Sequence, residues 1–313
     1  MNNHEIEAIE LSGIKEKAVS QHLGKNGING IGVGFKTTKG ILTDILSVVF
    51  YVNDKQKHPK LPLPSMIEGY PVDVVEKTFS DFNIKKKKKK ESDAYQVKGQ
   101  KDKVNPIIGG LKIAVGSTLS SYSGTSAIIA KDSNGKEVIL TNAHVVDNKV
   151  GTKIDQPDPV FFGSNVCAKV SASIEANHTH GVKPYYIDAA IATLDSSSRN
   201  FQIKTIYPNI QIISSKAPIV GSTVQKQGQI TGLTSGTIKT VDLTYQTSSG
   251  VRYDNIIEIT GSKFAASGDS GSAIFSKHTD GNNYIVGLFF AFNDSDYYAC
   301  NITGIENAMQ ITF

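Results

Sequence analysis

The sequence predicts a mainly β protein in which a pair of β-barrels follows a small α+β segment. Beyond residue 104 the chain is a series of short β-type runs with turns between them, followed by a short helical pattern over residues 304–311. The β-type runs lie at 107–110, 126–130, 138–141, 189–194, 222–227, 236–241, 256–260, 272–275 and 284–292. Many short strands at regular spacing are typical of barrel architectures.

The first 84 residues predict a small α+β module. Residues 5–24 carry apolar side chains at helical spacing, although Ser12-Gly13 could break this helix into two turns. Three strands are expected after it, at 28–35, 45–52 and 70–76.

Three alternating glycines, Gly30, Gly32 and Gly34, lie in the first of these strands. A dinucleotide-binding loop would need a helix after its glycines, whereas here another strand follows. The glycines therefore indicate a bulge or a close approach of two backbones, and we assign no phosphate site.

A lysine-rich stretch, residues 85–103, separates this module from residues 104–313. It opens with six consecutive lysines, Lys85 to Lys90. Such a run repels itself and is typical of a solvated linker. Contact with nucleic acid or an anionic membrane is the alternative, but no aromatic or arginine side chains are interleaved with the lysines. We therefore expect neither a nucleic acid nor a membrane as partner.

Composition predicts a cytoplasmic protein without a metal or cofactor. The chain has 313 residues and a net charge of +4, and its longest apolar run, Ile45 to Val52, has only strand length. It contains two cysteines, Cys167 and Cys300, which could pair but are more simply two buried thiols. His178 and His180 have alternating spacing but no Cys, Asp or Glu set beside them, so no metal is assigned.

Three separated residues have the types that nucleophilic catalysis requires. Ser270 lies in a Gly-Asp-Ser-Gly turn, which can present one hydroxyl and aim amide N–H groups at the same point. His144 follows Thr-Asn-Ala, and Asp188 interrupts the apolar run 186–194. An imidazole that accepts a proton from serine needs a buried carboxylate to orient it, and Asp188 is the candidate.

Each of these residues alone has a structural alternative. A Gly-Asp-Ser-Gly segment can be an ordinary loop, and a lone histidine can be a core residue. The acid could also be one of four others, Asp147, Asp155, Asp158 or Asp195. Asp188 is favoured over Asp195 because an acid among apolar residues needs an internal partner, whereas Asp195 opens a polar run typical of a solvated turn.

The chain order His144, Asp188, Ser270, with these surrounding residues, resembles the trypsin-like serine proteases of the chymotrypsin fold, of the bacterial type. The strands of residues 1–84 resemble the N-terminal segment of the plant narrow-leaf-type proteases. The resemblance implies a double six-stranded-type β-barrel over residues 104–313, with an oxyanion hole formed by the N–H groups of Gly268 and Ser270. In secreted relatives the acid that corresponds to Asp269 pairs with the new N-terminus that activation cleavage creates. No activation site is evident here, so another group must hold this loop.

The resemblance also suggests a substrate pocket formed by Phe264, Phe290 and Phe292. Phenylalanine at these positions disfavours cleavage after Lys or Arg, although the rings could simply pack the barrel. We expect an intracellular serine endopeptidase acting on a protein or peptide substrate. The alternative is a catalytically silent protein that binds peptides or assembles. In either case the N-terminal module could form a homo-oligomer.

Overall fold

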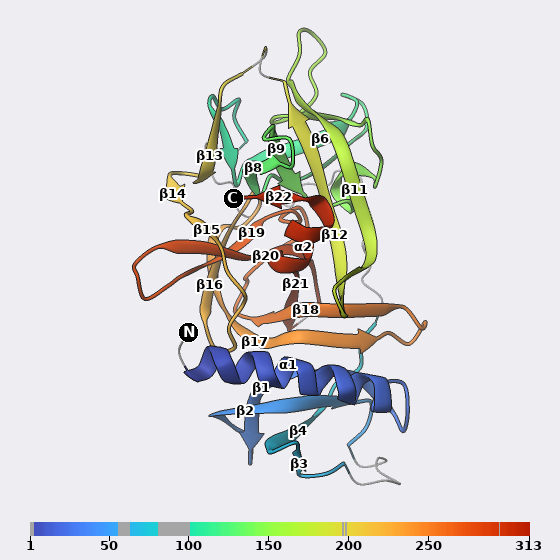
Figure 1. Ribbon diagram of the computed structural model, residues 1–313. Helices are drawn as coiled ribbons and strands as arrows, with labels where there is room; N and C mark the ends of the chain where they lie inside the picture. The colour runs from blue at the N-terminus through green and yellow to red at the C-terminus, as the bar shows by residue number, and fades with distance from the viewer. Residues whose placement is uncertain (1–2, 56–62, 81–100, 196, 198, 294) are drawn as a thin grey trace.

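The computed structural model describes residues 3–55, 63–80, 101–195, 197, 199–293 and 295–313 (Figure 1). The lysine run predicted as a linker lies outside these residues. The mainly β class is confirmed, because only two α-helices accompany three sheets of 11, 8 and 3 strands in the described ranges.

Residues 112–194 and the C-terminal strand β22 form one curved sheet. Its order is β22-β8-β9-β12-β11-β10-β6-β7, so β7 and β8 stand far apart in it although only two residues separate them in the chain. The sheet must therefore curl back on itself as a barrel. Its strands are β6 (Lys112–Gly116), β7 (Ser121–Thr125), β8 (Ile128–Asp132), β9 (Glu137–Thr141), β10 (Lys153–Asp155), β11 (Val166–His180), β12 (Lys183–Leu194) and β22 (Ile311–Thr312). A small sheet beside it contains β5 (Ile107–Gly109), β13 (Phe201–Ile206) and β14 (Ile210–Gln211).

The second half is a closed barrel. Its strands follow the order β16-β19-β20-β21-β18-β17, and β16 also pairs with β17, which closes the ring. These strands are β16 (Thr223–Gly228), β17 (Gly232–Gln246), β18 (Arg252–Thr260), β19 (Ala273–Lys277), β20 (Asn283–Phe292) and β21 (Asp296–Asn301), with β15 (Ser214–Ser215) beside β20. The predicted C-terminal helix is α2 (Ile302–Met309), and the side chain of Asn301 caps it by accepting from the N–H of Thr303 at 3.0 Å.

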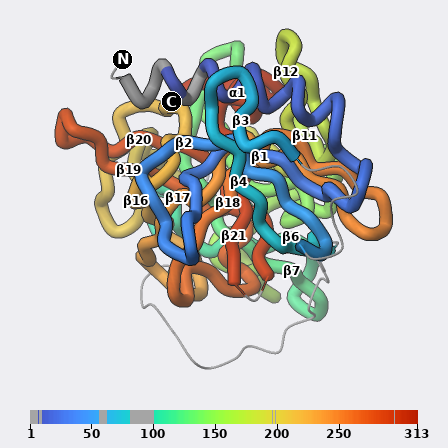
Figure 2. The backbone as a smooth tube through the Cα atoms, turned by 90° about the horizontal axis from the view of Figure 1, so that it is seen from below, coloured from blue at the N-terminus to red at the C-terminus, as the bar shows by residue number. Residues whose placement is uncertain are grey.

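The N-terminal strands extend the sheet of this second barrel. The segment contains α1 (Asn3–His22), β1 (Ile28–Thr38), β2 (Ile41–Val52), β3 (Met66–Ile67) and β4 (Tyr70–Glu76). Strand β1 pairs antiparallel with the C-terminal part of β17, residues 240–245, and β2, β4 and β3 follow in order across the sheet. Figure 2 shows these N-terminal strands from below, in front of the second barrel. The N-terminal segment and the second barrel thus belong to one continuous hydrogen-bonded sheet.

Gly32 explains how closely β1 and β17 approach. A Cβ atom at this position would lie 2.5 Å from the Thr240 side chain and 3.3 Å from the Leu243 backbone. The pairing also shifts register between Ile31 and Val33. The prediction of a bulge or a close backbone approach is therefore confirmed, and both features occur at this position.

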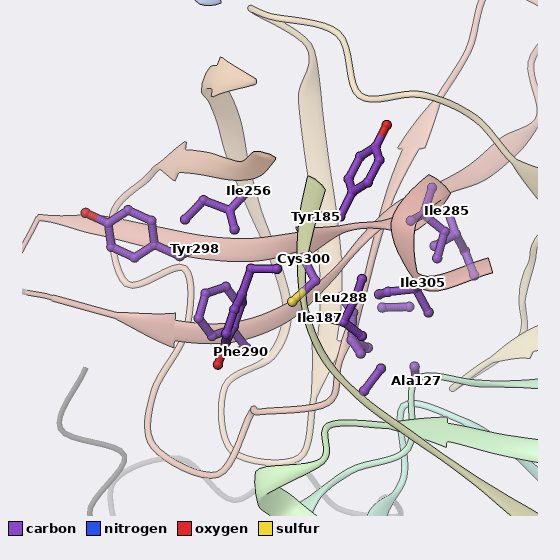
Figure 3. Close-up of a cluster of buried hydrophobic side chains, with 14 of the residues drawn as sticks. Ala127, Tyr185, Ile187, Ile256, Ile285, Leu288, Phe290, Tyr298, Cys300 and Ile305 are labelled. Carbon is purple, nitrogen blue, oxygen red and sulfur yellow. The ribbon is translucent and has the colours of Figure 1, made fainter. Parts of the chain in front are cut away.

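A large apolar cluster joins the two barrels (Figure 3). Tyr186 from β12 meets Tyr253 from β18 and Phe290 from β20, with ring centroids 4.6 and 5.4 Å away. Cys300, shown beside Leu288 in Figure 3, is fully buried in the same cluster. Because β12 also carries Asp188, this packing fixes the first barrel's acid against the second barrel.

Candidate active site

Strand pairing brings His144 and Asp188 together. Strand β9 pairs with β12, so that Thr141 lies opposite Ala190, and the chain then turns into a short 3₁₀ helix, η1 (His144–Val146). The Nδ1 atom of His144 lies 2.5 Å from Oδ2 of Asp188. The backbone N–H of His144 donates to Oδ1 of the same carboxylate at 3.1 Å. One carboxylate therefore orients both the ring and the backbone of His144.

The Asp188 carboxylate is fully buried, and its backbone is held as well. Asn142 donates its side-chain amide to the Asp188 carbonyl at 2.6 Å, and the Asp188 N–H donates to Sγ of Cys300 at 3.3 Å. Asp195, in contrast, is exposed and accepts from the backbone and hydroxyl of Ser197. Of the alternative acids, Asp158 instead pairs with Lys112 at 2.6 Å.

The backbone of Ser270 packs against β7, close to His144. The N–H of Thr125 donates to the Ser270 carbonyl at 2.8 Å. A Cβ atom on Gly124 would lie 2.6 Å from the Val145 side chain and 3.0 Å from the Ser270 carbonyl oxygen. Gly124 therefore contacts both the serine and the residue that follows His144.

The turn around Ser270 leaves two backbone donors unused. Gly268 has a φ of +105°, and its carbonyl accepts from Gln229 at 3.0 Å and from Thr125 at 3.2 Å. In the described part of the chain, the N–H groups of Gly268 and Ser270 have no acceptor. Two unused donors in one strained turn are what an oxyanion hole needs.

Asp269, between these two residues, is held by an internal lysine. Its carboxylate is fully buried and lies 3.2 Å from Nζ of Lys226, which is itself fully buried in β16. It also accepts from the N–H groups of Ile230, Thr231 and Ala266 and from the Thr231 hydroxyl, at 2.6 to 3.2 Å. Burial lowers the pKa of Lys226, and the charge of Asp269 opposes this shift. Lys226 is thus the group that holds the loop, and sequence reasoning had not identified it.

Two of the three predicted pocket phenylalanines gather around Tyr297. Phe264 is fully buried, its ring centroid lies 5.3 Å from that of Tyr297, and its N–H donates to the Tyr297 hydroxyl at 3.1 Å. Phe292 is 43% exposed and stacks on Tyr297 at 6.1 Å. Phe290 lies elsewhere, because it points into the cluster between the barrels and is only 2% exposed. A substrate could contact the ring of Phe292 but not those of Phe264 and Phe290.

Cys167 and Cys300 are both buried, free thiols. His178 and His180 lie on β11, and the described residues contain no group of three or more His, Cys, Asp or Glu that could hold a metal. A search of the same residues finds no helix with the length and apolarity to cross a bilayer.

The closed barrel and the curled first sheet define a protein of the chymotrypsin-fold class, and the candidate residues His144, Asp188 and Ser270 follow the chain order of serine peptidases with this fold. The model of peptidase family S64 matches residues 48–298, and the chain belongs to this family.

Individual known proteins show weaker likeness. The chain is 28% identical over 291 residues to the protein NARROW LEAF 1 of Oryza sativa subsp. japonica; the match covers 80% of the chain but only 49% of that protein. The chain thus spans about half the length of this curated relative. Two similar solved structures are Thermobifida fusca protease A (17% identity, TM-score 0.49) and Nocardiopsis protease (20% identity, TM-score 0.47). Each covers 66% of this chain, and this chain covers 96% and 97% of them respectively.

Proposed function

We propose that the protein is a serine endopeptidase that hydrolyses peptide bonds through an acyl-enzyme. The observation that carries this proposal is the fully buried Asp188 carboxylate bonded to Nδ1 of His144, in a chain of peptidase family S64. With the proton on Nδ1, Nε2 carries the lone pair that can accept a proton, as a general base must.

In the proposed reaction, the Ser270 oxygen attacks the peptide carbonyl while Nε2 of His144 takes the hydroxyl proton. The N–H groups of Gly268 and Ser270 bind the oxyanion, each contributing about 3 kcal/mol by comparison with measured cases. His144 then gives its proton to the leaving amine as the C–N bond breaks. Water, deprotonated by His144, hydrolyses the resulting ester and regenerates Ser270. The buried Asp188 carboxylate stabilises the imidazolium that forms in each half-reaction.

Substrates with apolar or small side chains before the scissile bond fit the site better than basic ones. Of the three predicted pocket residues only Phe292 offers its ring to a substrate, and this apolar ring stacks on Tyr297. Hydrolysis of matched peptide esters that carry leucine, alanine or arginine at that position tests this preference. Faster hydrolysis of the arginine ester would refute it.

The decisive experiment is labelling with a fluorophosphonate, which bonds covalently to an activated serine. Wild-type protein is expected to be labelled and Ser270→Ala to be unlabelled, with Ser272→Ala as the matched control in the same turn. Ser272 is fully buried, and its hydroxyl donates to the Asp269 carbonyl at 2.5 Å. The unfolding midpoint of the Ser272→Ala variant must therefore be measured in parallel. Absence of labelling in the folded wild type would instead favour the catalytically silent, peptide-binding alternative.

We further propose that the protein works in the cytoplasm. The two buried, unpaired thiols support this, since proteins in oxidising compartments more often contain disulfides. Fractionation of the source cells tests it, and recovery of the protein only outside the cytoplasm would refute it.

Self-association through the N-terminal segment is also proposed. The supporting observation is that Ile41 and Leu42, neighbours on β2, are 71% and 63% exposed. A single monomeric species in analytical ultracentrifugation at micromolar concentration would refute this proposal.

A further inference from the structure

A lysine of the N-terminal segment reaches into the second barrel. Lys77 follows β4, and its ammonium group contacts Oε1 of Glu258 on β18 and Oδ2 of Asp296 on β21, the latter at 2.7 Å. The Lys77 side chain is 12% exposed, and those of the two acids are 0% and 8% exposed. Lys239, which is more exposed, lies 3.4 Å from each of the same acids. The best-buried cation of this cluster thus comes from outside the barrel.

Both the backbone and the side chain of Lys77 are fixed in place. Its N–H donates to the carbonyl of Val52, and its carbonyl accepts from Asn29, which ties it to β2 and β1. The ammonium group also lies 5.3 to 5.9 Å from three ring centroids, those of Tyr51, Phe79 and Tyr298. Aromatic faces at this distance attract a cation. Burial opposes the charge, but Glu258 and Asp296 outweigh it and raise the pKa of Lys77, so the group is charged at neutral pH.

The anchored acid Asp296 stands at the start of β21, next to Tyr297. Its N–H donates to Oδ1 of Asn293 and its carbonyl accepts from the N–H of Asn293, so Asp296 is tied to the residue that follows β20. Phe292 is the last residue of β20 and pairs with Tyr297 on β21. The Tyr297 hydroxyl accepts from the N–H of Phe264, at the start of the loop that carries the candidate nucleophile.

We propose that Lys77 is a positioning residue for substrate selection: by fixing Asp296 it fixes the start of β21, where Tyr297 pairs with Phe292, and so the substrate-contacting wall of the site. The N-terminal segment would then complete this wall instead of acting as a detachable gate. This inference rests on the proposed peptidase function.

The test compares Lys77→Met with Lys17→Met. Methionine keeps most of the apolar stem and removes the charge. Lys17 belongs to the same segment but makes an exposed pair with Glu68, at 2.9 Å, and provides the matched control. Two readouts are needed, namely the rate of fluorophosphonate labelling and kcat/KM for peptides that differ only in the side chain before the scissile bond. The labelling probe is small and does not need the wall, whereas peptide discrimination does.

Lys77→Met is expected to be labelled within about threefold of the wild-type rate. For the preferred peptide we expect kcat/KM to fall at least tenfold, mainly through KM, and the preference among peptides to flatten. Lys77→Arg, which retains a cation, should recover part of the discrimination, and Lys17→Met should behave as wild type. If Lys77→Met does not fold, Asp296→Asn, which changes almost no volume, carries the same expectation.

Two results would overturn the inference. One is an unchanged preference and KM in folded Lys77→Met, and the other is an equal loss of labelling and of hydrolysis of every peptide. Failure of the wild type itself to be labelled refutes the peptidase proposal separately, and the inference with it.

Discussion

Replacing Lys226 by methionine tests how the loop of the candidate nucleophile is held. The substitution preserves the apolar stem and leaves the Asp269 carboxylate buried without its cation. Removing one partner of a buried ion pair typically costs about 3 to 5 kcal/mol. Asp269 keeps four hydrogen bonds, from Ile230, Thr231 and Ala266, so the lower end of that range applies. The burial cost that lowers the pKa of Lys226 is also relieved, which again favours about 3 kcal/mol.

A loss of about 3 kcal/mol raises the ratio of unfolded to folded protein roughly 10²-fold. We expect this from urea unfolding at neutral pH, together with at least tenfold slower fluorophosphonate labelling, because the N–H groups of Gly268 and Ser270 flank Asp269. Gly228→Ala should disturb the ion pair between Lys226 and Asp269 from the other partner's side. The new Cβ atom on β16 would lie 2.3 Å from Oδ1 of Asp269, so the carboxylate would have to move. A Lys226→Met protein with unfolding free energy within about 0.5 kcal/mol of wild type and normal labelling would refute this reasoning.

Three further predictions concern the acid, the pH dependence and the N-terminal segment. Asp188→Asn should lower kcat roughly 10⁴-fold, whereas Asp195→Asn should have little effect, and the opposite ranking in peptide hydrolysis would show that the acid is misassigned. Burial raises the pKa of Glu258, but the positive charges of Lys77 and Lys239 outweigh this and hold the pKa below its usual 4.5. Its contribution to stability is therefore present above about pH 4.5 and is lost as the pH falls further; urea midpoints that do not decrease on acidification through this range would contradict this. Trypsin should cut first within the lysine-rich residues 85–103, yet both fragments should co-elute in gel filtration because β1 stays paired with β17; separation of the fragments would argue against that pairing.

The candidate site could be predicted from sequence where the chemistry requires particular residue types. The turn around Ser270 needs glycine at a positive φ, which marks the segment, and Asp188 stands out as a single acid in an apolar run. Lys226 left a comparable signal, a lone cation in a short strand, but pairing it with Asp269 requires knowing which strands adjoin the loop. That information is non-local and no pattern within β16 contains it.

Two further features depend on non-local information that the sequence pattern lacks, namely which face of β20 each side chain takes and where the N-terminal strands attach. Phe289 and Phe290 point to opposite sides of β20, and a register shift between Phe289 and Ala291 alters the alternation that follows. Period-2 patterning predicts that the two rings diverge, but it does not tell which one enters the cluster between the barrels, as Phe290 does. Likewise, the hairpin of β1 and β2 was predicted, whereas its union with β17 depends on an edge formed about 200 residues later.

That late edge has a consequence for synthesis on the ribosome. At about 5 to 20 residues per second, β1 and β2 emerge some 10 to 40 seconds before β17 exists to receive them. Meanwhile β1 exposes an unpaired row of N–H and C=O groups beside apolar residues that are buried in the finished protein, such as Ile31 and Val33. A nascent chain of this design needs protection from premature strand pairing with other chains.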